Sequence, residues 1–340
     1  MLGSALYSSR SQIALRMISF DGRPIDRDFW LSRLTDAENL RLRTLPGRDA
    51  FRLVYGESDL LPSLIIDRYR DCFVVQTLSQ GMDTLKQMWT ELLIERYSPA
   101  AVVERNEAKV REMEGLPRIS ATLHGELPSG LSVNEAGLNF AVDLLKGQKT
   151  GWFLDQSENR IAAERYARGR ALDCFTFQGG FALHLARRSE HVVAVDSSAE
   201  AVQMAAKNAA ANEISNVEFV EENVFDFLGR MERGGERFDT IVLDPPAFAK
   251  NRASIPAAAR GYKEINLRAM KMLTRGGVLI TCSCSYHMGE VDFLNMLSEA
   301  AADAERSVRI LEKRMQSPDH PVMVSMPETY YLKCIVLSVL

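Results

Sequence analysis

The stretch Ala171-Leu172-Asp173-Cys174-Phe175-Thr176-Phe177-Gln178-Gly179-Gly180 decides the fold class of this 340-residue chain. An apolar run ends at an acidic residue, and paired glycines then precede a second apolar segment. This pattern is typical of a strand that turns tightly into a helix, because glycine permits close backbone approach and a helix N-terminus offers unpaired amides. Such crossovers build doubly wound α/β sheets.

The chain on either side of this stretch repeats the pattern. From about residue 143, helix and strand signals alternate, which predicts a mixed, seven-stranded, Rossmann-like sheet. Strands are predicted at 171–175, 191–195, 217–220, 238–243, 277–282, 308–314 and 330–339. Helices are predicted at 154–168, 180–188, 199–212, 224–233, 262–273 and 290–306. Because no helix separates the last two strands, we expect them to pair antiparallel at the end of the sheet.

The part of the chain before residue 143 lacks the regular alternation of helix and strand, and its pattern predicts a small α+β domain. Strands are predicted at 64–66, 72–76, 101–103 and 138–142, the first two as a hairpin. A helix is predicted at 82–97, ending before Pro99, and residues 115–130 lack a clear pattern. The sequence therefore predicts two domains that divide at 142/143.

Composition excludes several classes of protein. Hydrophobic residues make up 46% of the chain and charged residues 25%, which is ordinary for a globular protein. No run approaches the roughly 18 apolar residues that a membrane span needs. The five cysteines are odd in number and lie in apolar segments, which favours reduced thiols in the cytoplasm over disulfides. The histidines have no ligand spacing with them, so we predict no metal site.

Polar residues that follow the predicted strands indicate a nucleoside cofactor, because ligands of open α/β sheets bind at the carboxyl ends of the strands. Asp196 ends the second strand, 23 residues after Asp173, where a carboxylate can accept both ribose hydroxyls. Asn223 follows the third strand, where it could bond an adenine amino group. The loop after Asp173 lacks the G-x-G-x-x-G spacing of dinucleotide sites, which favours S-adenosylmethionine (SAM) over NAD. For each residue alone, a simple loop cap is the alternative.

Asp244-Pro245-Pro246-Ala247-Phe248 follows the fourth strand and is suited to a flat heterocyclic base. Two prolines stiffen the loop, so that its carbonyls and the Asp244 side chain are held in place before binding. Phe248 could stack on an extruded base, a contact worth about 1–3 kcal/mol. The alternative is a rigid turn with a buried phenylalanine.

Cys284, in the segment Thr281-Cys282-Ser283-Cys284-Ser285, indicates the chemistry. C5 of a pyrimidine is a poor nucleophile, but a thiolate that adds to C6 converts the ring into an enamine whose C5 can attack a sulfonium methyl group. Cys282 is expected inside the strand and Cys284 at its exposed end. An ordinary buried cysteine is the alternative for either.

Basic residues gather directly after the Asp-Pro-Pro loop. Between Pro245 and Arg275 the chain has a net charge of +6, although the whole chain carries −4. The seven basic residues are Lys250, Arg252, Arg260, Lys263, Arg268, Lys271 and Arg275. This stretch could meet an RNA phosphate backbone. A solvated helix face is the other interpretation.

In these residues the chain resembles the RlmI-type 23S rRNA cytosine-C5 methyltransferases, which are class I SAM-dependent enzymes. The matching motifs are Gly56-Glu57-Ser58-Asp59, Gly147-Gln148-Lys149-Thr150-Gly151-Trp152-Phe153-Leu154-Asp155-Gln156, the Asp173 loop, Asp244 to Phe248, Gly261-Tyr262-Lys263-Glu264-Ile265-Asn266 and Ser283-Cys284-Ser285. The resemblance implies that Cys284 is the nucleophile and that Asp244 meets the base edge. It also implies a SAM site formed by Gln156, Asp173, Phe175, Thr176, Gly179, Asp196, Asn223 and Asp244.

The resemblance further implies how the chain is divided and where the substrate binds. Residues 1–20 would be the remnant of a PUA domain, with strands at 5–8 and 11–16. Residues 21–142 would form a central domain for RNA recognition, and residues 143–340 the methyltransferase domain. The substrate would contact Pro245, Pro246, Phe248, Lys250, Arg252, Tyr262 and Lys263. Asn223 departs from the family, which usually has an aspartate there.

The expected function is therefore formation of 5-methylcytosine in 23S rRNA, either as naked RNA or within a large-subunit assembly intermediate. A base-nitrogen methyltransferase is an alternative, because such enzymes also carry Asp/Asn-Pro-Pro loops. A non-catalytic RNA-binding factor for ribosome assembly is another. A small-molecule substrate would leave the basic stretch without a purpose. We expect a cytoplasmic protein, and a homodimer is left open.

Overall fold

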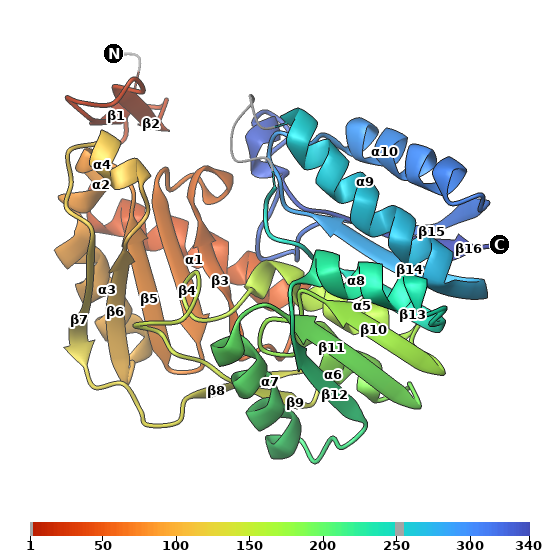
Figure 1. Cartoon of the computed structure of the whole chain (residues 1–340). Coiled ribbons are helices and arrows are strands. Elements are labelled where there is room, and N and C mark those ends of the chain that lie inside the picture. Colours follow the sequence, from red (N-terminus) through yellow and green to blue (C-terminus); the bar gives the residue numbers. More distant parts are fainter. Residues whose placement is uncertain (1–2, 249–254) are drawn as a thin grey trace. The chain divides into compact units, whose positions relative to one another are not determined.

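The computed structural model describes residues 3–248 and 255–340 of the chain. Contacts divide the chain into two compact units, whose helices and strands are labelled in Figure 1. Unit 1 comprises Met1–Asp155 and Ser317–Thr329, and unit 2 comprises Gln156–Gln316 and Tyr330–Leu340. The units thus divide at 155/156, later than the boundary expected at 142/143. Residues 317–329, which we assigned to the second domain, belong to unit 1.

Unit 2 is built on a seven-stranded sheet of order β12-β11-β10-β13-β14-β16-β15. Its strands are β10 (Arg170–Cys174), β11 (His191–Asp196), β12 (Val217–Glu221), β13 (Phe238–Leu243), β14 (Leu273–Ser283), β15 (Val308–Arg314) and β16 (Lys333–Val339). Neighbouring strands are parallel from β12 to β14, whereas β16 runs antiparallel to both β14 and β15. The expected mixed sheet and the antiparallel pairing of its last two strands are confirmed.

Helices cover both faces of this sheet (Figure 1). They are α5 (Ser157–Glu164), α6 (Gly180–Ala186), α7 (Ala199–Ala211), α8 (Val224–Arg233), α9 (Ile255–Met272) and α10 (Glu290–Asp303). Successive side chains of a strand point to opposite faces. Ile241 and Leu243 of β13 therefore pack with α8, α9 and α10, whereas Val242 between them packs with α5 and α6. These two cores fix the strand ends that carry the candidate site.

Unit 1 contains a five-stranded sheet of order β3-β4-β5-β6-β7. Its strands are β3 (Ala50–Tyr55), β4 (Leu64–Tyr69), β5 (Cys72–Thr77), β6 (Ala101–Asn106) and β7 (Ile119–Gly125). Its helices are α1 (Arg27–Thr44), α2 (Gln80–Asp83), α3 (Lys86–Tyr97) and α4 (Val110–Met113). The hairpins are β1 (Ser4–Tyr7) with β2 (Leu15–Ser19) and β8 (Ser132–Glu135) with β9 (Leu138–Ala141). Short 3-10 turns lie at Gly56–Asp59, Leu154–Gln156 and Pro327–Thr329. In the core of the unit, Trp30 of α1 meets Trp89 of α3 edge to face.

Three predictions for unit 1 need correction. The helix expected at 82–97 is two helices, because Ser79 caps α2 and a second helix begins after Leu85. Strand β7 lies in the stretch 115–130, where we saw no pattern. Helix α1 was not predicted, although Trp30, Leu34, Ala37 and Arg41 bury one face of it.

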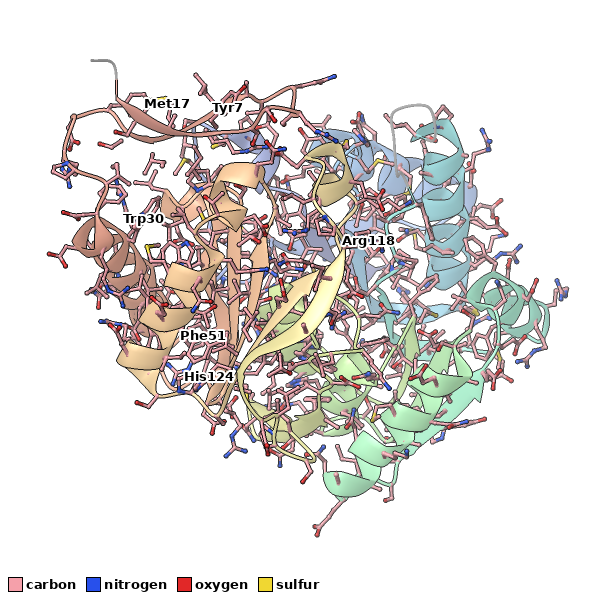
Figure 2. All side chains as sticks on the ribbon, turned by 90° about the vertical axis from the view of Figure 1, so that its left-hand side faces the viewer. Tyr7, Met17, Trp30, Phe51, Arg118 and His124 are labelled. Carbon is pink, nitrogen blue, oxygen red and sulfur yellow. The ribbon has the colours of Figure 1, made fainter. Side chains whose placement is uncertain are left out.

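The hairpin β1–β2 occupies the residues that we interpreted as a PUA remnant. Its second strand is Leu15–Ser19 rather than the expected 11–16. Tyr7, Leu15 and Met17 are exposed on it, and Figure 2 labels two of them. The hairpin thus presents apolar side chains that the described part of unit 1 does not cover.

The segment 317–329 is tied into unit 1 by hydrogen bonds to Asp319. Its carboxylate accepts from the Arg52 backbone N–H at 2.8 Å, and its carbonyl accepts from Arg41 Nη2 at 2.8 Å. The Arg41 guanidinium is fully buried and also donates to both carboxylate oxygens of Asp59. A late segment of the chain therefore completes a buried polar network in the N-terminal unit.

Candidate active site

Polar residues follow five consecutive strands of unit 2 and lie at one edge of its sheet. In chain order they are Asp173 with its loop after β10, Asp196 ending β11, Asn223 after β12, Asp244 after β13 and Cys284 after β14. The strand ends are aligned, because Cys174 pairs in register with both Val195 and Leu243. The order of strands reverses between β10 and β13, which is the topological switch point where such sheets bind ligands.

Asp173 is a fully buried carboxylate with an unsatisfied oxygen. Its Oδ2 accepts from the Thr176 hydroxyl at 2.6 Å, whereas Oδ1 has no hydrogen-bond partner among the described residues. Burial raises the pKa of Asp173 to about 7. The negative charges of Asp244 and Asp196 act in the same direction, and hydrogen bonds from the Thr176 hydroxyl and the Ala182 backbone oppose the shift. A buried acceptor of this kind is suited to a ligand that brings an N–H or O–H donor or a positive charge.

The loop after β10 is held in a strained conformation. Phe175 and Phe177 have positive φ angles of 66° and 49°, and Gly179 has φ 86°. The Phe177 backbone N–H donates to Asp196 Oδ2 at 2.9 Å, and the Thr176 N–H donates to the backbone of β11. A positive φ angle at a non-glycine residue raises the energy of the backbone, and such residues cluster at functional sites.

Asp196 and Asn223 both contact backbone amides. Asp196 also accepts from the Ser198 N–H at 3.0 Å, and its carboxylate has further lone pairs for ribose hydroxyls. Asn223 caps α8, where its Oδ1 accepts from the Phe225 N–H at 2.9 Å. The oxygen that we expected to meet adenine therefore already has a local partner.

Gln156 and Asp244 form a hydrogen bond next to β13, one of the two strands at the switch point. Gln156 Nε2 donates to Asp244 Oδ1 at 2.7 Å, and Gln156 Oε1 accepts from Asn159 Nδ2 at 2.7 Å. Gln156 is buried and Asp244 is half-buried. The amide thus orients the carboxylate of the Asp-Pro-Pro loop.

Cys284 is the cysteine of this chain that reaches the site edge. It is partly exposed, its Sγ lies 3.9 Å from the Pro245 carbonyl, and the other four cysteines are buried. Cys282 pairs in register with Cys334, and this neighbour together with burial raises the pKa of Cys282 well above its ordinary value. Cys282 therefore stays a thiol inside the strand, as its position suggested.

Tyr262, whose contact with the substrate stays a prediction, supports the segment that carries Cys284. Its side chain is fully buried, and its hydroxyl bonds the hydroxyls of Ser285 at 2.9 Å and Ser283 at 3.1 Å. Burial raises the pKa of Tyr262, so the phenol remains protonated and can donate to one of the two serines. The serines on either side of Cys284 are thus fixed by one side chain of α9.

Lys333 is a buried residue at this site that the sequence analysis missed. Its Nζ donates to the Ser285 and Tyr331 carbonyls, each at 2.8 Å. Burial lowers the pKa of Lys333 to about 8, whereas the negative charges of Cys284 and Glu290 act to raise it. A single lysine in an apolar strand gives no sequence signal, because its neighbours come from residues far along the chain.

Phe248 belongs to an aromatic cluster. Its ring lies 4.7 Å from the Tyr262 ring, 5.9 Å from Phe225 and 6.3 Å from Phe175, measured between centroids. Pro245 before it is buried and Pro246 is exposed. The Phe248 ring thus forms part of a packed wall beside the loop.

Three of the seven basic residues after this loop form ion pairs with acidic residues of neighbouring helices. Lys263 contacts Glu299 and Asp303 of α10. Arg268 and Lys271 both contact Glu232 of α8. For these three cations the solvated-face interpretation is the better one. Arg260 and Arg275 are exposed, and Lys250 and Arg252 lie outside the described residues.

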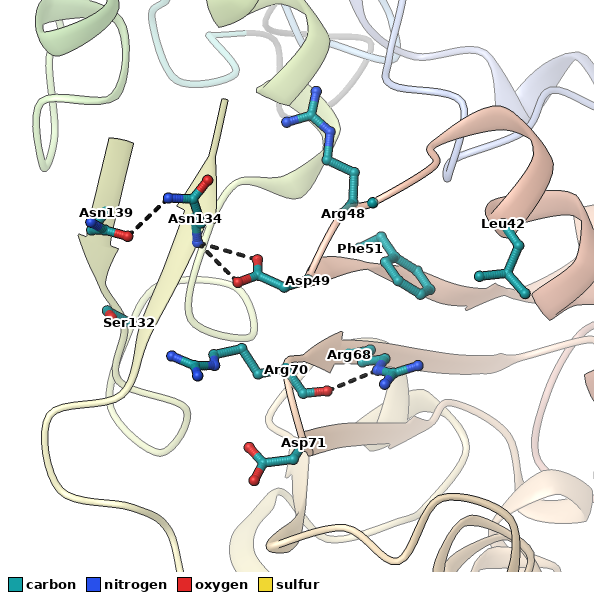
Figure 3. Close-up of a pocket in the computed structure, with 11 residues that line it drawn as sticks. Leu42, Arg48, Asp49, Phe51, Arg68, Arg70, Asp71, Ser132, Asn134 and Asn139 are labelled. Atoms are coloured by element: carbon teal, nitrogen blue, oxygen red, sulfur yellow. Dashed lines mark hydrogen bonds between the residues drawn. The ribbon is translucent and has the colours of Figure 1, made fainter. Parts of the chain in front are cut away.

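An open cavity of about 580 Å³ lies in unit 1 (Figure 3). Its polar lining includes three arginines, two carboxylates and two side-chain amides: Arg48, Arg68, Arg70, Asp49, Asp71, Asn134 and Asn139. The Arg68 guanidinium is stacked on aromatic rings and donates to the Arg70 carbonyl at 2.8 Å. Arg70 is exposed, and its side chain projects along the cavity in Figure 3.

Comparison with known proteins agrees with this geometry. Residues 101–333 match the family model described as S-adenosylmethionine-dependent methyltransferase. The chain belongs to this family. It is 39% identical over 340 residues to "Ribosomal RNA large subunit methyltransferase I" of Aliivibrio fischeri (strain ATCC 700601 / ES114), covering 98% of this chain and 86% of the relative. It is 41% identical over 344 residues to the protein of that name from Aeromonas salmonicida (strain A449), covering 99% and 87%.

Solved structures of other proteins have the same fold as this chain. A protein described as a methyltransferase and crystallised with SAH has a TM-score of 0.86 at 20% identity, covering 99% of this chain and 88% of that one. The M. jannaschii tRNA m1G37 methyltransferase has a TM-score of 0.55 at 14% identity, covering 99% and 92%. These likenesses identify the class I SAM-dependent methyltransferase fold and leave the target atom to be argued from the site.

The residues present fit SAM, the cofactor of the family. The unsatisfied Asp173 oxygen and the Asp196 carboxylate offer acceptors for a cationic nucleoside with ribose hydroxyls. A Cβ at Gly179 would lie 3.3 Å from the Ala205 Cβ, so the loop is packed as closely as a glycine allows.

None of the described helices is long and apolar enough to cross a membrane.

Proposed function

We propose that this protein methylates C5 of a cytosine in 23S rRNA through a covalent adduct with Cys284. The observation that carries the proposal is the position of Cys284, the one partly exposed cysteine, against the Pro245 carbonyl of the Asp-Pro-Pro loop. The relatives named for methylation of large-subunit rRNA support an RNA substrate. The cysteines form no disulfide, which fits a cytoplasmic location.

The residues of unit 2 would act as follows. The Cys284 thiolate forms a bond to C6 of the cytosine, and the electrons of the C5–C6 double bond make C5 nucleophilic. SAM supplies the electrophilic methyl group that C5 takes up. Loss of the C5 proton to a base then restores the double bond and expels the thiolate. Asp244, which accepts a hydrogen bond from Gln156, would also accept one from the base edge.

SAM itself would be held by the loop after β10 and its neighbours. Asp173 would supply its unsatisfied carboxylate oxygen, and Asp196 its remaining lone pairs. Gly179 permits close approach of the backbone. These groups are fixed before binding, so they would position the methyl donor and the base. They have no new charge to stabilise, because the sulfonium charge is lost in the transfer.

RNA recognition would be shared with unit 1. Its open cavity combines arginine guanidinium groups, which suit phosphates, with asparagine amides, which suit base edges. The ion pairs of Lys263, Arg268 and Lys271 remove much of the positive charge that we expected after the Asp-Pro-Pro loop. The cavity of unit 1 is therefore a second candidate for backbone contacts.

Methyl transfer from labelled SAM to unmodified 23S rRNA, followed by nucleoside analysis, tests the proposal. We expect the wild-type protein to form 5-methylcytosine and Cys284→Ala to form none. Cys282→Ala, which changes a buried cysteine on the same strand, is the matched control and should retain activity. Methylated guanine or adenine that persists in Cys284→Ala would replace the proposal by a base-nitrogen methyltransferase. SAM binding without any transfer would instead favour a non-catalytic RNA-binding factor.

A further inference from the structure

Lys333 occupies an unusual place beside the proposed nucleophile. It is the first residue of β16 and pairs in register with Ser283 of β14, immediately before Cys284. Only 2% of the Lys333 surface is exposed, and the residues that follow it in the strand are apolar. Its Nζ reaches the Ser285 carbonyl on the other side of Cys284. The lysine thus spans the turn that carries the thiol.

A lysine in this position is costly unless its charge is used. The two carbonyls that accept from Nζ are neutral, and an ammonium has a third N–H. Burying an ammonium without a negative partner is strongly unfavourable. A methionine of similar length would fill the same space without that cost.

Two acidic groups act electrostatically on Lys333. They are Cys284, whose chain neighbours Ser283 and Ser285 respectively pair with Lys333 and bond its Nζ, and Glu290 at the start of α10. Glu290 is already shared, because its carboxylate oxygens contact Lys313 Nζ and the Tyr330 hydroxyl, each at 2.9 Å. The Tyr262 phenol also faces Cys284, but it stays protonated and carries no charge. Cys284 is therefore the group that a Lys333 ammonium can change most.

We propose that Lys333 is a positioning residue that favours the thiolate of Cys284 by placing its ammonium on the backbone segment that carries the sulfur. In the neutral pair, the Cys284 proton moves to the Lys333 amine, which gives a thiolate and an ammonium with the number of protons unchanged. When Lys333 is already protonated, the thiol proton leaves to water and the ammonium stabilises the thiolate. The inference deepens the proposed function, because it assigns the activation of the same nucleophile.

A purely structural role for Lys333 makes a different prediction. If it only tied the Ser285 and Tyr331 carbonyls together, its removal would lower stability without changing the acidity of Cys284. The two roles are separated by measuring the pH dependence of Cys284 alkylation, which needs neither RNA nor SAM.

The experiment alkylates the native protein with iodoacetamide between pH 5.5 and 10 and quantifies the Cys284 peptide by mass spectrometry. Four buried cysteines favour selective reaction at Cys284. We expect the wild-type midpoint below the value of about 8.5 of an ordinary thiol. Lys333→Met should raise the midpoint by about one pH unit or more, which slows alkylation at pH 7 about tenfold, with equal rates at high pH.

Two further variants make the result specific. Lys313→Met removes a positive charge that also faces Glu290 and should leave the midpoint unchanged. Lys333→Arg keeps the charge and should stay close to wild type. A wild-type midpoint at or above 8.5, or equal midpoints in wild type and Lys333→Met, would overturn the inference. If Lys333→Met does not fold, the wild-type midpoint and the Arg variant decide.

Failure of this inference differs from failure of the proposed function. A shifted alkylation midpoint together with methylation that survives Cys284→Ala would leave the activated thiolate in place and remove its role in methyl transfer. Methylation that requires Cys284, with an unshifted midpoint, would leave the function in place and make Lys333 structural.

Discussion

Replacing Asp173 by asparagine should make the stability of the SAM-free protein less dependent on pH. Burial raises the pKa of Asp173 to about 7 from its ordinary 3.8. As pH rises, the unfolded state therefore loses this proton before the folded state does. The stabilising contribution is present at low pH and is lost as the pH rises through the folded-state value. Integrated between pH 5 and pH 8, the loss is about 2.5 kcal/mol, and Asp173→Asn should not show it.

Urea unfolding at pH 5 and pH 8, followed by circular dichroism, measures this difference. The gap in unfolding free energy between Asp173→Asn and wild type should increase by about 2.5 kcal/mol from pH 5 to pH 8 in favour of the variant. All three tryptophans lie in unit 1, so their fluorescence reports a transition that the substitution should leave alone. Asp226→Asn, at an exposed carboxylate of α8, is the matched control. A gap that stays constant with pH would refute the assignment of Asp173 as a buried, protonated acid.

Two further substitutions test the cofactor loop and the cavity of unit 1. Gly179→Ala places a Cβ 3.3 Å from the Ala205 Cβ on a backbone with φ 86°, which costs about 1–2 kcal/mol. Calorimetry should therefore show that SAM binds about tenfold more weakly to this variant. Unchanged affinity would mean that the loop relaxes freely. Arg70→Glu should weaken binding to an rRNA fragment in a filter assay and reduce the salt dependence by about one to two phosphate contacts, whereas Arg118→Glu should not. Equal salt slopes in wild type and Arg70→Glu would place the RNA elsewhere.

The sheet of unit 2 could be predicted because its strands are short apolar runs separated by amphipathic helices. Helix α8 and strand β15 have the predicted bounds, 224–233 and 308–314. Strand β7 was missed although Ile119, Ala121 and Leu123 alternate with polar residues, because these apolar positions are only half-buried at a sheet edge and the run is short. Propensity alone is a weak guide at such an edge.

The candidate site was predictable where chemistry and strand ends coincide, as at Asp173, Asp244 and Cys284. It was not predictable where function depends on partners distant in sequence. The contact of Lys263 with RNA stays a prediction, and its ion pairs with two acidic residues of α10 could not be foreseen from the sequence. Lys333 gave no signal at all, because only the antiparallel pairing of β16 with β14 brings it to Cys284.

The return of residues 317–329 to unit 1 affects how the chain can fold while it is being synthesised. Translation proceeds from the N-terminus, and N-terminal domains usually fold first. Here the partner that Arg41 and Arg52 require, Asp319, emerges only after almost the whole of unit 2. A nascent unit 1 would hold the Arg41–Asp59 pair with one buried donor unpaired until the chain is nearly complete. Neither unit can be released by a single cut, so a fragment ending at residue 155 should be less stable than unit 1 within the intact protein.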